Sequence, residues 1–130
     1  MTGRLSGLLR NVNPSTSGAK AEQLSGKYIQ RQGYKVIARN ARYKAGEIDL
    51  IAEKDDQRIF IEVKYRKDNR HGAATEFVDL KKQQKLIKAA LQWIQDHDPE
   101  MNYAYRFDVM TMEGSANSIN WIQNAFEAHF

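Results

Sequence analysis

Four charged side chains lie in two short apolar segments of this chain, at spacings that could place them on one face of a β-hairpin. Side chains alternate along a strand, so residues two positions apart share a face. If the turn falls within 54–57, paired positions have numbers that sum to 111, and Asp49 lies opposite Glu62. In the same register Glu47 lies opposite Lys64. A slip by one residue would turn the acids of one strand into the apolar face, so the hydrophobic pattern supports this register.

Such an arrangement has a specific chemical use. Two carboxylates that face one another repel, and a divalent cation together with the neighbouring lysine would relieve the repulsion. Carboxylate oxygens suit Mg²⁺ or Mn²⁺, which can polarise a phosphodiester and lower the pKa of a bound water. A lysine can orient that water or stabilise charge that develops on the phosphate. The spacing Asp49-x12-Glu62-x-Lys64 is therefore typical of metal-dependent nucleases, although charged outer faces are common on hairpins.

The composition excludes several other kinds of site. A chain of 130 residues is expected to form a single domain, here at 18–130. There is no cysteine, so thiolate metal sites and disulfides are excluded, and the three histidines lack the spacing of zinc ligands. No apolar run reaches the length of a membrane span, so we expect a cytoplasmic location and no membrane partner. Residues 1–17 lack the apolar core of a signal peptide and are expected to form a disordered basic arm.

Positive charge is concentrated in the first two thirds of the chain. The net charge is +4, but residues 1–88 hold 19 basic and 10 acidic groups, whereas residues 89–130 hold one arginine and six acids. The basic region surrounds the acidic hairpin, which indicates a polyanionic partner such as nucleic acid. An ordinary solvated basic surface would have the same composition, so charge alone leaves both interpretations open.

The hydrophobic pattern predicts the elements that position the hairpin. A helix is expected over 19–32, with Gly33 as its C-terminal stop. A strand follows at 34–40, and the two hairpin strands cover about 47–53 and 58–65. These three strands form a meander, because the connections between them are short.

A second amphipathic helix and one or two further strands complete the pattern. The helix is expected over 78–96, a strand over 103–112 and a short strand at 119–122, before a tail at 125–130. A helical crossover makes the next strand parallel to its neighbour. The sequence therefore predicts an α/β fold, a mixed sheet flanked by helices. The core face of the second helix is expected to consist of Leu80, Ile87, Ala90, Leu91 and Ile94, with Leu86 and Trp93 at its edge.

Basic side chains beside these elements are candidates for phosphate contact. Some follow the first strand in an expected loop, some lie in the polar segment 66–72, and some lie on the second helix. Loops positioned beside a rigid sheet often carry binding groups. A solvated face is the other interpretation of the helical lysines. The nucleic-acid-binding candidates are Arg39, Arg42, Lys44, Arg66, Lys67, Arg70, Lys81, Lys82, Lys85 and Lys88.

Four polar positions outside the hairpin have a structural interpretation beside the functional one. Glu22 lies at the border of the apolar face of the first helix, where the helix dipole alone would favour an acid. Gln83 falls inside the apolar arc of the second helix, and we interpret it as a structural hydrogen bonder in preference to a secondary site residue. Arg106 and Asp108 share a strand face and are expected to pair with each other or with loop backbone rather than to act in catalysis.

Two segments of the hairpin carry specific motifs, GEIDLI at Gly46–Ile51 and FIEVKYR at Phe60–Arg66. Further motif positions are Gly18–Glu22, Gly33–Tyr34, Asn40, Val78–Asp79, Lys82–Gln83, Arg106–Val109 and Asn124–Phe126. Together these motifs resemble the YraN family of small bacterial proteins, over about residues 18–127. That family is similar to the restriction-endonuclease-like fold, especially to archaeal Holliday-junction resolvases. The similarity implies a core of a helix, three strands, a helix and a strand, with a metal site.

The resemblance also implies roles for individual residues. The implied catalytic set, matched by position, is Glu22, Asp49, Glu62 and Lys64. Metal would be held by the three acids of this set with the help of the Val63 carbonyl, and the lysine would position the nucleophilic water. Glu47 would be a secondary ligand or the ion-pair partner of Lys64. The family often has a glycine before the helix acid, where this chain has Ala21, which is still small enough for close packing.

Two functions of different classes follow. The first is a Mg²⁺- or Mn²⁺-dependent endonuclease acting on DNA, with branched or single-stranded DNA as candidate substrates. The second is a nucleic-acid-binding or adaptor protein that keeps the fold without turnover, in which Glu47 and Lys64 form a structural ion pair. The intact set of acids and lysine favours the nuclease. A symmetric homodimer would fit cleavage of a junction, although no interface is readable in the sequence.

Overall fold

The computed structural model describes residues 17–66, 78–114 and 118–128 of the chain. The basic arm expected before residue 18 lies outside the described residues, except that the first helix already begins at Ser17. Within the described ranges, neither helix is long and apolar enough to cross a membrane. The elements are α1 (Ser17–Arg31), β2 (Lys35–Tyr43), β3 (Gly46–Lys54), β4 (Gln57–Arg66), α2 (Leu80–His97), β5 (Ala104–Glu113) and β6 (Ser118–Phe126).

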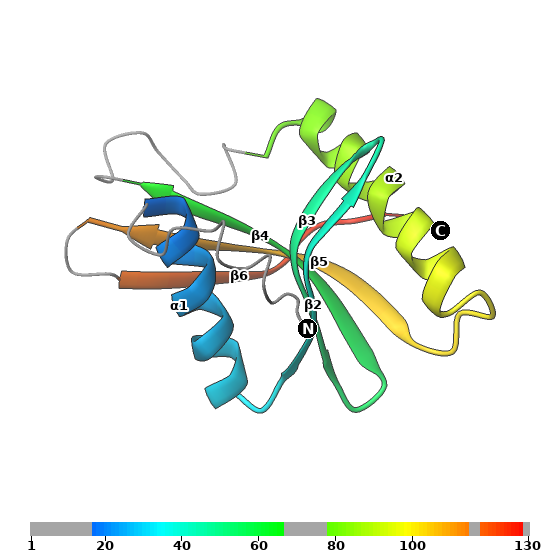
Figure 1. Ribbon diagram of the computed structural model, residues 1–130, viewed down its shortest axis with the longest axis horizontal. Coiled ribbons are helices and arrows are strands. Elements are labelled where there is room, and N and C mark those ends of the chain that lie inside the picture. The colour runs from blue at the N-terminus through cyan, green and yellow to red at the C-terminus, as the bar shows by residue number, and fades with distance from the viewer. Residues whose placement is uncertain (1–16, 67–77, 115–117, 129–130) are drawn as a thin grey trace, which may run out of the picture.

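The strands form one mixed sheet with the order β2-β3-β4-β5-β6. β2, β3 and β4 are an antiparallel meander. After the crossover through α2, β5 runs parallel to β4, as expected for a helical connection of this length. β6 pairs antiparallel with β5. The expected α/β fold, with a mixed sheet and two helices, is confirmed (Figure 1).

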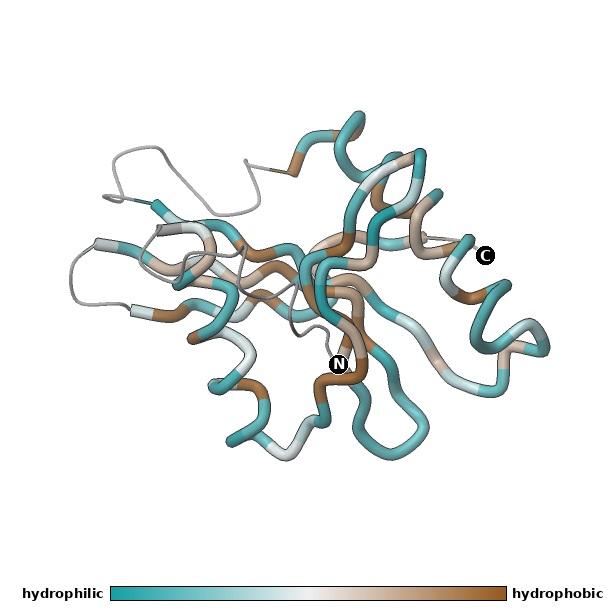
Figure 2. The backbone as a smooth tube through the Cα atoms, viewed as in Figure 1, coloured by the Kyte–Doolittle hydropathy of each residue, from teal (hydrophilic) through white to brown (hydrophobic). Residues whose placement is uncertain are grey.

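The sheet has a hydrophobic core on each face. α1 packs on one face, together with Leu50 and Ile61, whereas α2 packs on the other, together with Phe60 and Phe107. Because side chains of neighbouring strand residues point to opposite faces, one strand can supply both cores. Hydrophobic segments accordingly gather in the middle of the sheet, and hydrophilic segments lie at the hairpin ends (Figure 2).

Local chemistry ends α1 where the sequence predicts. The helix stops before Gly33, whose φ of +94° lies in the left-handed region that glycine adopts without strain. The N–H of Tyr34 then donates to the carbonyl of Ile29 at 3.1 Å, which satisfies one of the last helical carbonyls. This tight exit leads α1 directly into β2, so the helix lies alongside the meander that carries the acids.

The start of α2 is fixed by two side chains. Asp79 caps the helix, because its Oδ1 accepts the N–H of Lys82 at 2.8 Å. The amide of Gln83 donates to the carbonyl of Val78 at 2.9 Å. Gln83 therefore has the structural role that we preferred for it, and it ties the segment before the helix to the first turn.

Two strands are longer than the sequence predicts. β2 continues to Tyr43, so Arg42 lies in a strand rather than in the loop expected after residue 40. β6 runs to Phe126, which stacks on Phe107 with 4.8 Å between the ring centroids, so residues 125 and 126 are not a tail. In both cases a neighbouring strand extends the element, and such tertiary pairing is not visible in a local pattern.

The buried face of α2 is rotated relative to the face predicted for it. Leu80 is 73% exposed and Leu91 is 37% exposed, although both were expected in the core. Leu86 and Trp93, expected at the edge, are buried. Trp93 packs edge-on against Phe60 with 5.9 Å between the ring centroids. Burying an indole removes more apolar area from water than burying a leucine, so the tryptophan determines the orientation of the helix.

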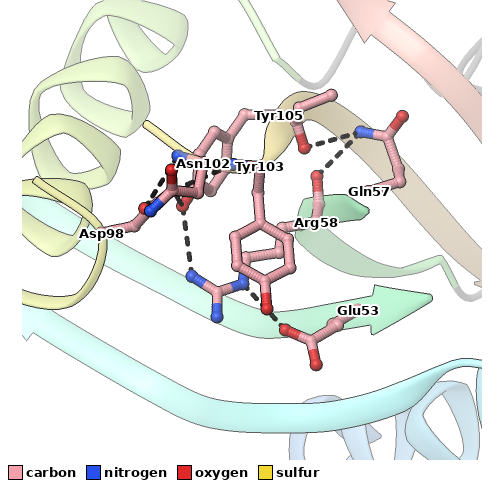
Figure 3. Close-up of polar contacts among 8 residues, drawn as sticks. Glu53, Gln57, Arg58, Asp98, Asn102, Tyr103 and Tyr105 are labelled. Carbon is pink, nitrogen blue, oxygen red and sulfur yellow. Dashed lines mark hydrogen bonds and ion pairs between the residues drawn. The ribbon is translucent and has the colours of Figure 1, made fainter. Parts of the chain in front are cut away.

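A polar network ties the end of α2 to the β3–β4 hairpin (Figure 3). Arg58 donates to Glu53 Oε1 at 2.9 Å, and its guanidinium lies 3.6 Å from the ring centroid of Tyr103. The hydroxyl of Tyr105 donates to Asp98 Oδ2 at 2.8 Å, just beyond α2. This network lies near the hairpin turn, whereas the predicted site residues of β4 lie further along the strand. It stabilises the fold that presents the site.

Candidate functional site

The regular pairing between β3 and β4 begins at the hairpin turn and stops at Leu50, just before it would reach Asp49. The pairs run from the hairpin turn to Leu50↔Ile61, in the expected register whose numbers sum to 111. At the next position, Oδ2 of Asp49 accepts the backbone N–H of Val63 at 2.9 Å. A carboxylate thus takes up a backbone donor of the neighbouring strand, and Asp49 is held against β4 at the point where the ladder stops.

The carboxyl groups of Asp49 and Glu62 are hydrogen-bonded to one another. Burial first, and then the negative charge of Glu62, raise the pKa of Asp49 to about 8, although the Val63 N–H acts in the opposite direction. At neutral pH the pair therefore holds a proton that an isolated aspartate would have lost. The two carboxyl groups converge on one place, as the hairpin register predicts.

Glu62 lies between two lysines. Its side chain is 5% exposed, and Lys64 Nζ lies 3.3 Å from its Oε2. Lys82 Nζ, from α2, lies 3.2 Å from the same oxygen. The acid-x-lysine pair of β4 is thus in contact, and α2 supplies a second cation. The sequence predicts Lys82 only as a phosphate-binding residue, and the structure adds a direct contact with the acid pair.

α1 brings a third acid, Glu22, close to the same centre. Burial raises the pKa of Glu22, and the negative charges of Glu47 and then Glu62 raise it further. With its amide nitrogen turned toward the acids, Asn40 donates to Glu22 Oε1 at 3.1 Å and to Glu47 Oε2 at 2.9 Å. Glu22 therefore joins the hairpin acids through β2, from an element that is distant in sequence.

Glu47 has a different partner from the one that the sequence predicts. In the β2–β3 register Glu47 faces Arg42, and Arg42 Nε lies 3.2 Å from Glu47 Oε1. Lys64 is paired with Glu62 instead. The expected ion pair between Glu47 and Lys64 is wrong because the regular β3–β4 ladder stops at Leu50, so the register cannot be extended to residue 47.

Exposed basic side chains lie on two elements next to these acids, the β2–β3 hairpin and α2. The tip of the β2–β3 hairpin packs against α2, since a Cβ on Gly46 would lie only 3.2 Å from the carbonyl oxygen of Lys85. Figure 1 shows this hairpin reaching the first half of α2, so the basic turn adjoins the basic face of the helix. The exposed members of the predicted nucleic-acid set are Arg39, Arg42, Lys44, Lys81, Lys85 and Lys88.

Of three other members of that set, one is buried and two lie outside the described residues. Arg66 is 8% exposed and forms an ion pair with Glu113, so its guanidinium is not presented to a phosphate, which corrects its assignment. Lys67 and Arg70 lie outside the described residues. Beyond the candidate set, Arg106 and Asp108 pair with each other as expected, with Nε 2.9 Å from Oδ1.

Sequence reasoning missed the contacts that Asn40 and Lys82 make with the acids of the candidate site. Asn40 was noted only as a motif position, and the signal that could have singled it out is an asparagine inside a strand of otherwise apolar and basic residues. The contact between Lys82 and Glu62 joins α2 to β4 across the fold. No local pattern marks such a contact, because helical periodicity tells which face a residue occupies but not which strand that face meets.

The donor chemistry of the acid pair suits a divalent cation. Asp49 and Glu62 are two hydrogen-bonded carboxyl groups, and a cation can replace the proton that they hold. The carbonyl of Val63 is a further oxygen on the same strand. Among the residues that the structure describes, no three acids, histidines or cysteines are already grouped as ligands of one ion. A metal site here would therefore depend on Asp49 and Glu62, and Glu22 would have to supply the third acid.

Comparison with known proteins assigns the chain to a family. The pattern of the uncharacterised protein family UPF0102 matches residues 21–112. A UPF0102 protein of Vibrio parahaemolyticus is 44% identical over 83% of this chain and 89% of that protein. A UPF0102 protein of Stutzerimonas stutzeri is 42% identical over 87% and 96%, and one of Pseudomonas putida is 37% identical over 92% and 99%. The chain therefore belongs to the UPF0102 family, which is the YraN family that its hairpin motifs resemble.

Proposed function

We propose that this protein is a divalent-metal-dependent endonuclease that hydrolyses phosphodiester bonds in DNA. The observation that carries the proposal is the pair Asp49 and Glu62, two hydrogen-bonded carboxyl groups, of which Glu62 also contacts lysines from two elements. Buried like charges in contact destabilise a fold, and groups with such perturbed pKa values cluster at functional sites. A structural role alone would not require two acids to be held together.

Each residue of the centre has a role in this proposal. Asp49 and Glu62, with the Val63 carbonyl, would hold Mg²⁺ or Mn²⁺, and the ion would supply a water of lowered pKa and a positive charge for the phosphate. Lys64 lies 3.3 Å from Glu62, where its ammonium can donate to a water or to a phosphate oxygen. Glu22 would add negative charge from α1.

The arrangement of elements and charges supports the same proposal. The order of helix, three antiparallel strands, helix and parallel strand is the order that the resemblance to restriction-endonuclease-like proteins implies. Exposed basic residues on the β2–β3 hairpin and on α2 adjoin the acids, and a surface of this kind attracts the phosphate backbone without reading sequence. Branched or single-stranded DNA remains the candidate substrate class.

A second candidate is a nucleic-acid-binding protein that does not cut. The observation in its favour is that Glu62 already has two lysine partners, and that the described residues contain no preformed group of three metal ligands. In this alternative the lysines neutralise the acid permanently, and the basic surface alone is functional. The two candidates differ in what Lys64 does, so a variant at that position separates them.

The test is a cleavage assay with Mn²⁺ on linear, flapped and four-way DNA, using the wild type and Lys64→Ala. The nuclease proposal predicts that the wild type cuts at least one of these substrates and that Lys64→Ala cuts about 100-fold more slowly. DNA affinity should stay nearly unchanged, because a single ammonium is a small part of a surface that binds many phosphates. Lys35→Ala, which removes an exposed lysine at the start of β2, is the charge-matched control and should cut like the wild type.

Two results would refute the nuclease proposal. If the wild type binds DNA but cuts none of the substrates, and Lys64→Ala behaves in the same way, the nuclease proposal is refuted and the binding protein stands. A wild type that neither binds nor cuts would refute both candidates.

A further inference from the structure

Asn40 has a backbone conformation that is uncommon inside a strand. Its φ is +51°, in the left-handed region that asparagine adopts more readily than most side-chain-bearing residues. Its neighbours in β2 pair with residues 50 and 48 of β3, so Asn40 lies opposite Asp49. The conformational exception on β2 therefore lies beside the acid at which the β3–β4 ladder stops. Uncommon backbone conformations persist where surrounding contacts hold them, and they concentrate at functional sites.

The side chain of Asn40 bridges two acids of different elements. With the amide nitrogen turned toward the acids, it lies 3.1 Å from Glu22 Oε1 on α1 and 2.9 Å from Glu47 Oε2 on β3. The opposite orientation of the amide would place its carbonyl oxygen against two acceptors, so the hydrogen-bond partners identify which atom is nitrogen. The second oxygen of Glu47 is held by Arg42 at 3.2 Å. A continuous series of contacts thus runs from Arg42 through Glu47 and Asn40 to Glu22.

An uncharged donor suits this position. An amide has two N–H groups, enough to serve both carboxylates without adding charge. A lysine or arginine in its place would neutralise the acids and weaken their attraction for a cation, whereas an apolar residue would remove the amide donor from both acids. Asn40 therefore holds like-charged groups near each other while it preserves their negative charge.

We propose that Asn40 is the positioning residue of the site, whose amide holds the Glu22 carboxylate beside the Asp49–Glu62 pair. This inference rests on the proposed metal-dependent function, because a divalent cation at the pair is what would use the third acid. Asn40 itself does not touch the reacting atoms and acts through Glu22. Its removal should therefore reproduce part of the effect of removing Glu22 and nothing further.

The test measures Mn²⁺ binding by calorimetry in the wild type, Asn40→Gly, Glu22→Ala and the double variant. Glycine adopts the φ of residue 40 without strain, so the substitution removes the amide and preserves the backbone. We expect Asn40→Gly to weaken Mn²⁺ binding about three- to tenfold, the range that one net hydrogen bond supplies. In the Glu22→Ala background the same substitution should have no additional effect. Alanine is used because glutamine would keep an oxygen that Asn40 could still bind.

A matched control exists in the same chain. Asn124 on β6 has a φ of +52°, and only its backbone N–H is needed to donate to Asp108 Oδ1, at 2.9 Å. Asn124→Gly therefore makes the same chemical change at the same backbone conformation, away from the acids of the candidate site, and should leave Mn²⁺ affinity unchanged. The proposal is overturned if Asn40→Gly binds Mn²⁺ like the wild type. It is also overturned if Asn40→Gly weakens binding as much in the Glu22→Ala background as in the wild type.

A metal-free measurement separates this inference from the proposed function. Urea unfolding of the same four proteins gives a double-mutant cycle, in which contacting residues have non-additive effects and distant residues have additive effects. We expect the stability loss in the double variant to be smaller than the sum of the two single losses, and Asn124→Gly to be additive with Glu22→Ala. If the wild type binds no Mn²⁺, the proposed function fails and this cycle decides alone: non-additive losses support the holding role of Asn40, and additive losses overturn it.

Discussion

The surroundings of Asp49 act on its protonation in opposite directions. The backbone N–H of Val63 favours the charged carboxylate, whereas burial and the neighbouring Glu62 favour the protonated form, and together these raise the pKa of Asp49 to about 8. The fold therefore binds a proton at this residue more tightly than the unfolded chain does. Such a group stabilises the protein while it is protonated and destabilises it once it is charged.

The first prediction concerns the pH dependence of stability. The folded pKa of Asp49 is raised, so its favourable contribution is present below the unfolded value of about 4 and is lost as the pH rises toward 8. Asn at position 49 imitates the protonated acid, with an oxygen for the Val63 N–H and a donor for Glu62. Relative to Asp49→Asn, the wild type should lose up to about 1.4 kcal/mol of unfolding free energy per pH unit between pH 4 and 8.

Urea unfolding at several pH values measures this difference. Asp56→Asn is the control, because that carboxylate lies exposed in the hairpin turn. Equal pH dependence of the wild type and Asp49→Asn would show that the acid pair does not hold an additional proton.

The second prediction concerns Lys82. Removing it by Lys82→Met leaves the buried Glu62 with Lys64 as its remaining lysine partner, so the folded state should lose about 1 kcal/mol of stability without metal. Lys81→Met is the matched control, since that side chain is exposed on the same helical turn. Thermal or urea unfolding compares the two variants. Equal effects would mean that the ammonium of Lys82 contributes nothing at Glu62.

At the scale of elements, two close approaches bring the site together. The β2–β3 hairpin touches α2 through Gly46, and β2 touches α1 through Gly26, where a Cβ would lie 2.8 Å from a guanidinium nitrogen of Arg39. The neighbours differ in kind. Gly46 meets the backbone of a helix, whereas Gly26 meets the end of a flexible side chain.

The third prediction follows from that difference. Gly46→Ala should destabilise the protein by about 1 kcal/mol or more, because the backbone of α2 cannot move away independently of the helix. Gly26→Ala should be neutral or stabilising by about 0.5–1 kcal/mol, because alanine favours the helix and the Arg39 side chain can move aside. Unfolding midpoints of both variants provide the measurement. A Gly46→Ala protein as stable as the wild type would contradict the close hairpin–helix contact.

The same elements show how far the sequence could predict the structure. Alternation and a short turn gave the register of the hairpin, and the helical crossover gave the parallel pair β4–β5. The stop of the ladder at Leu50 and the left-handed φ of Asn40 could not be predicted, because both depend on contacts with other elements. For that reason Asp49 and Glu62 were correctly brought together, whereas Glu47 was given Lys64 as a partner instead of Arg42.

At the scale of the whole molecule, the acids of the site lie beside a helix that carries exposed lysines. The acids converge at the sheet, and exposed lysines of α2 adjoin them through the hairpin contact. A polyanion drawn to the basic residues would therefore come close to the acids only if a cation compensated their charge. Under the proposed function, this arrangement would link DNA binding to metal binding without a separate module to read the substrate.

The fourth prediction tests the basic surface. Replacing Lys81, Lys85 and Lys88 together by glutamine should weaken DNA binding and reduce its salt dependence, by about 0.9 in the log–log slope for each phosphate that is no longer neutralised. Fluorescence anisotropy at several salt concentrations measures both quantities. A triple variant that binds like the wild type would show that these lysines form a solvated face only.

The most direct test of a cation site at the acid pair is calorimetry of Mn²⁺ binding in two buffers with different ionisation enthalpies, which counts the protons released. If Mn²⁺ replaces the proton held by Asp49 and Glu62, wild-type protein at pH 7 should release about one proton per ion, because the pKa of Asp49 is about 8. At pH 9 the release should fall nearly to zero, and Asp49→Asn should bind Mn²⁺ far more weakly at both pH values. Absence of a saturable heat, or binding at pH 7 without proton release, would contradict a cation site at this pair of acids.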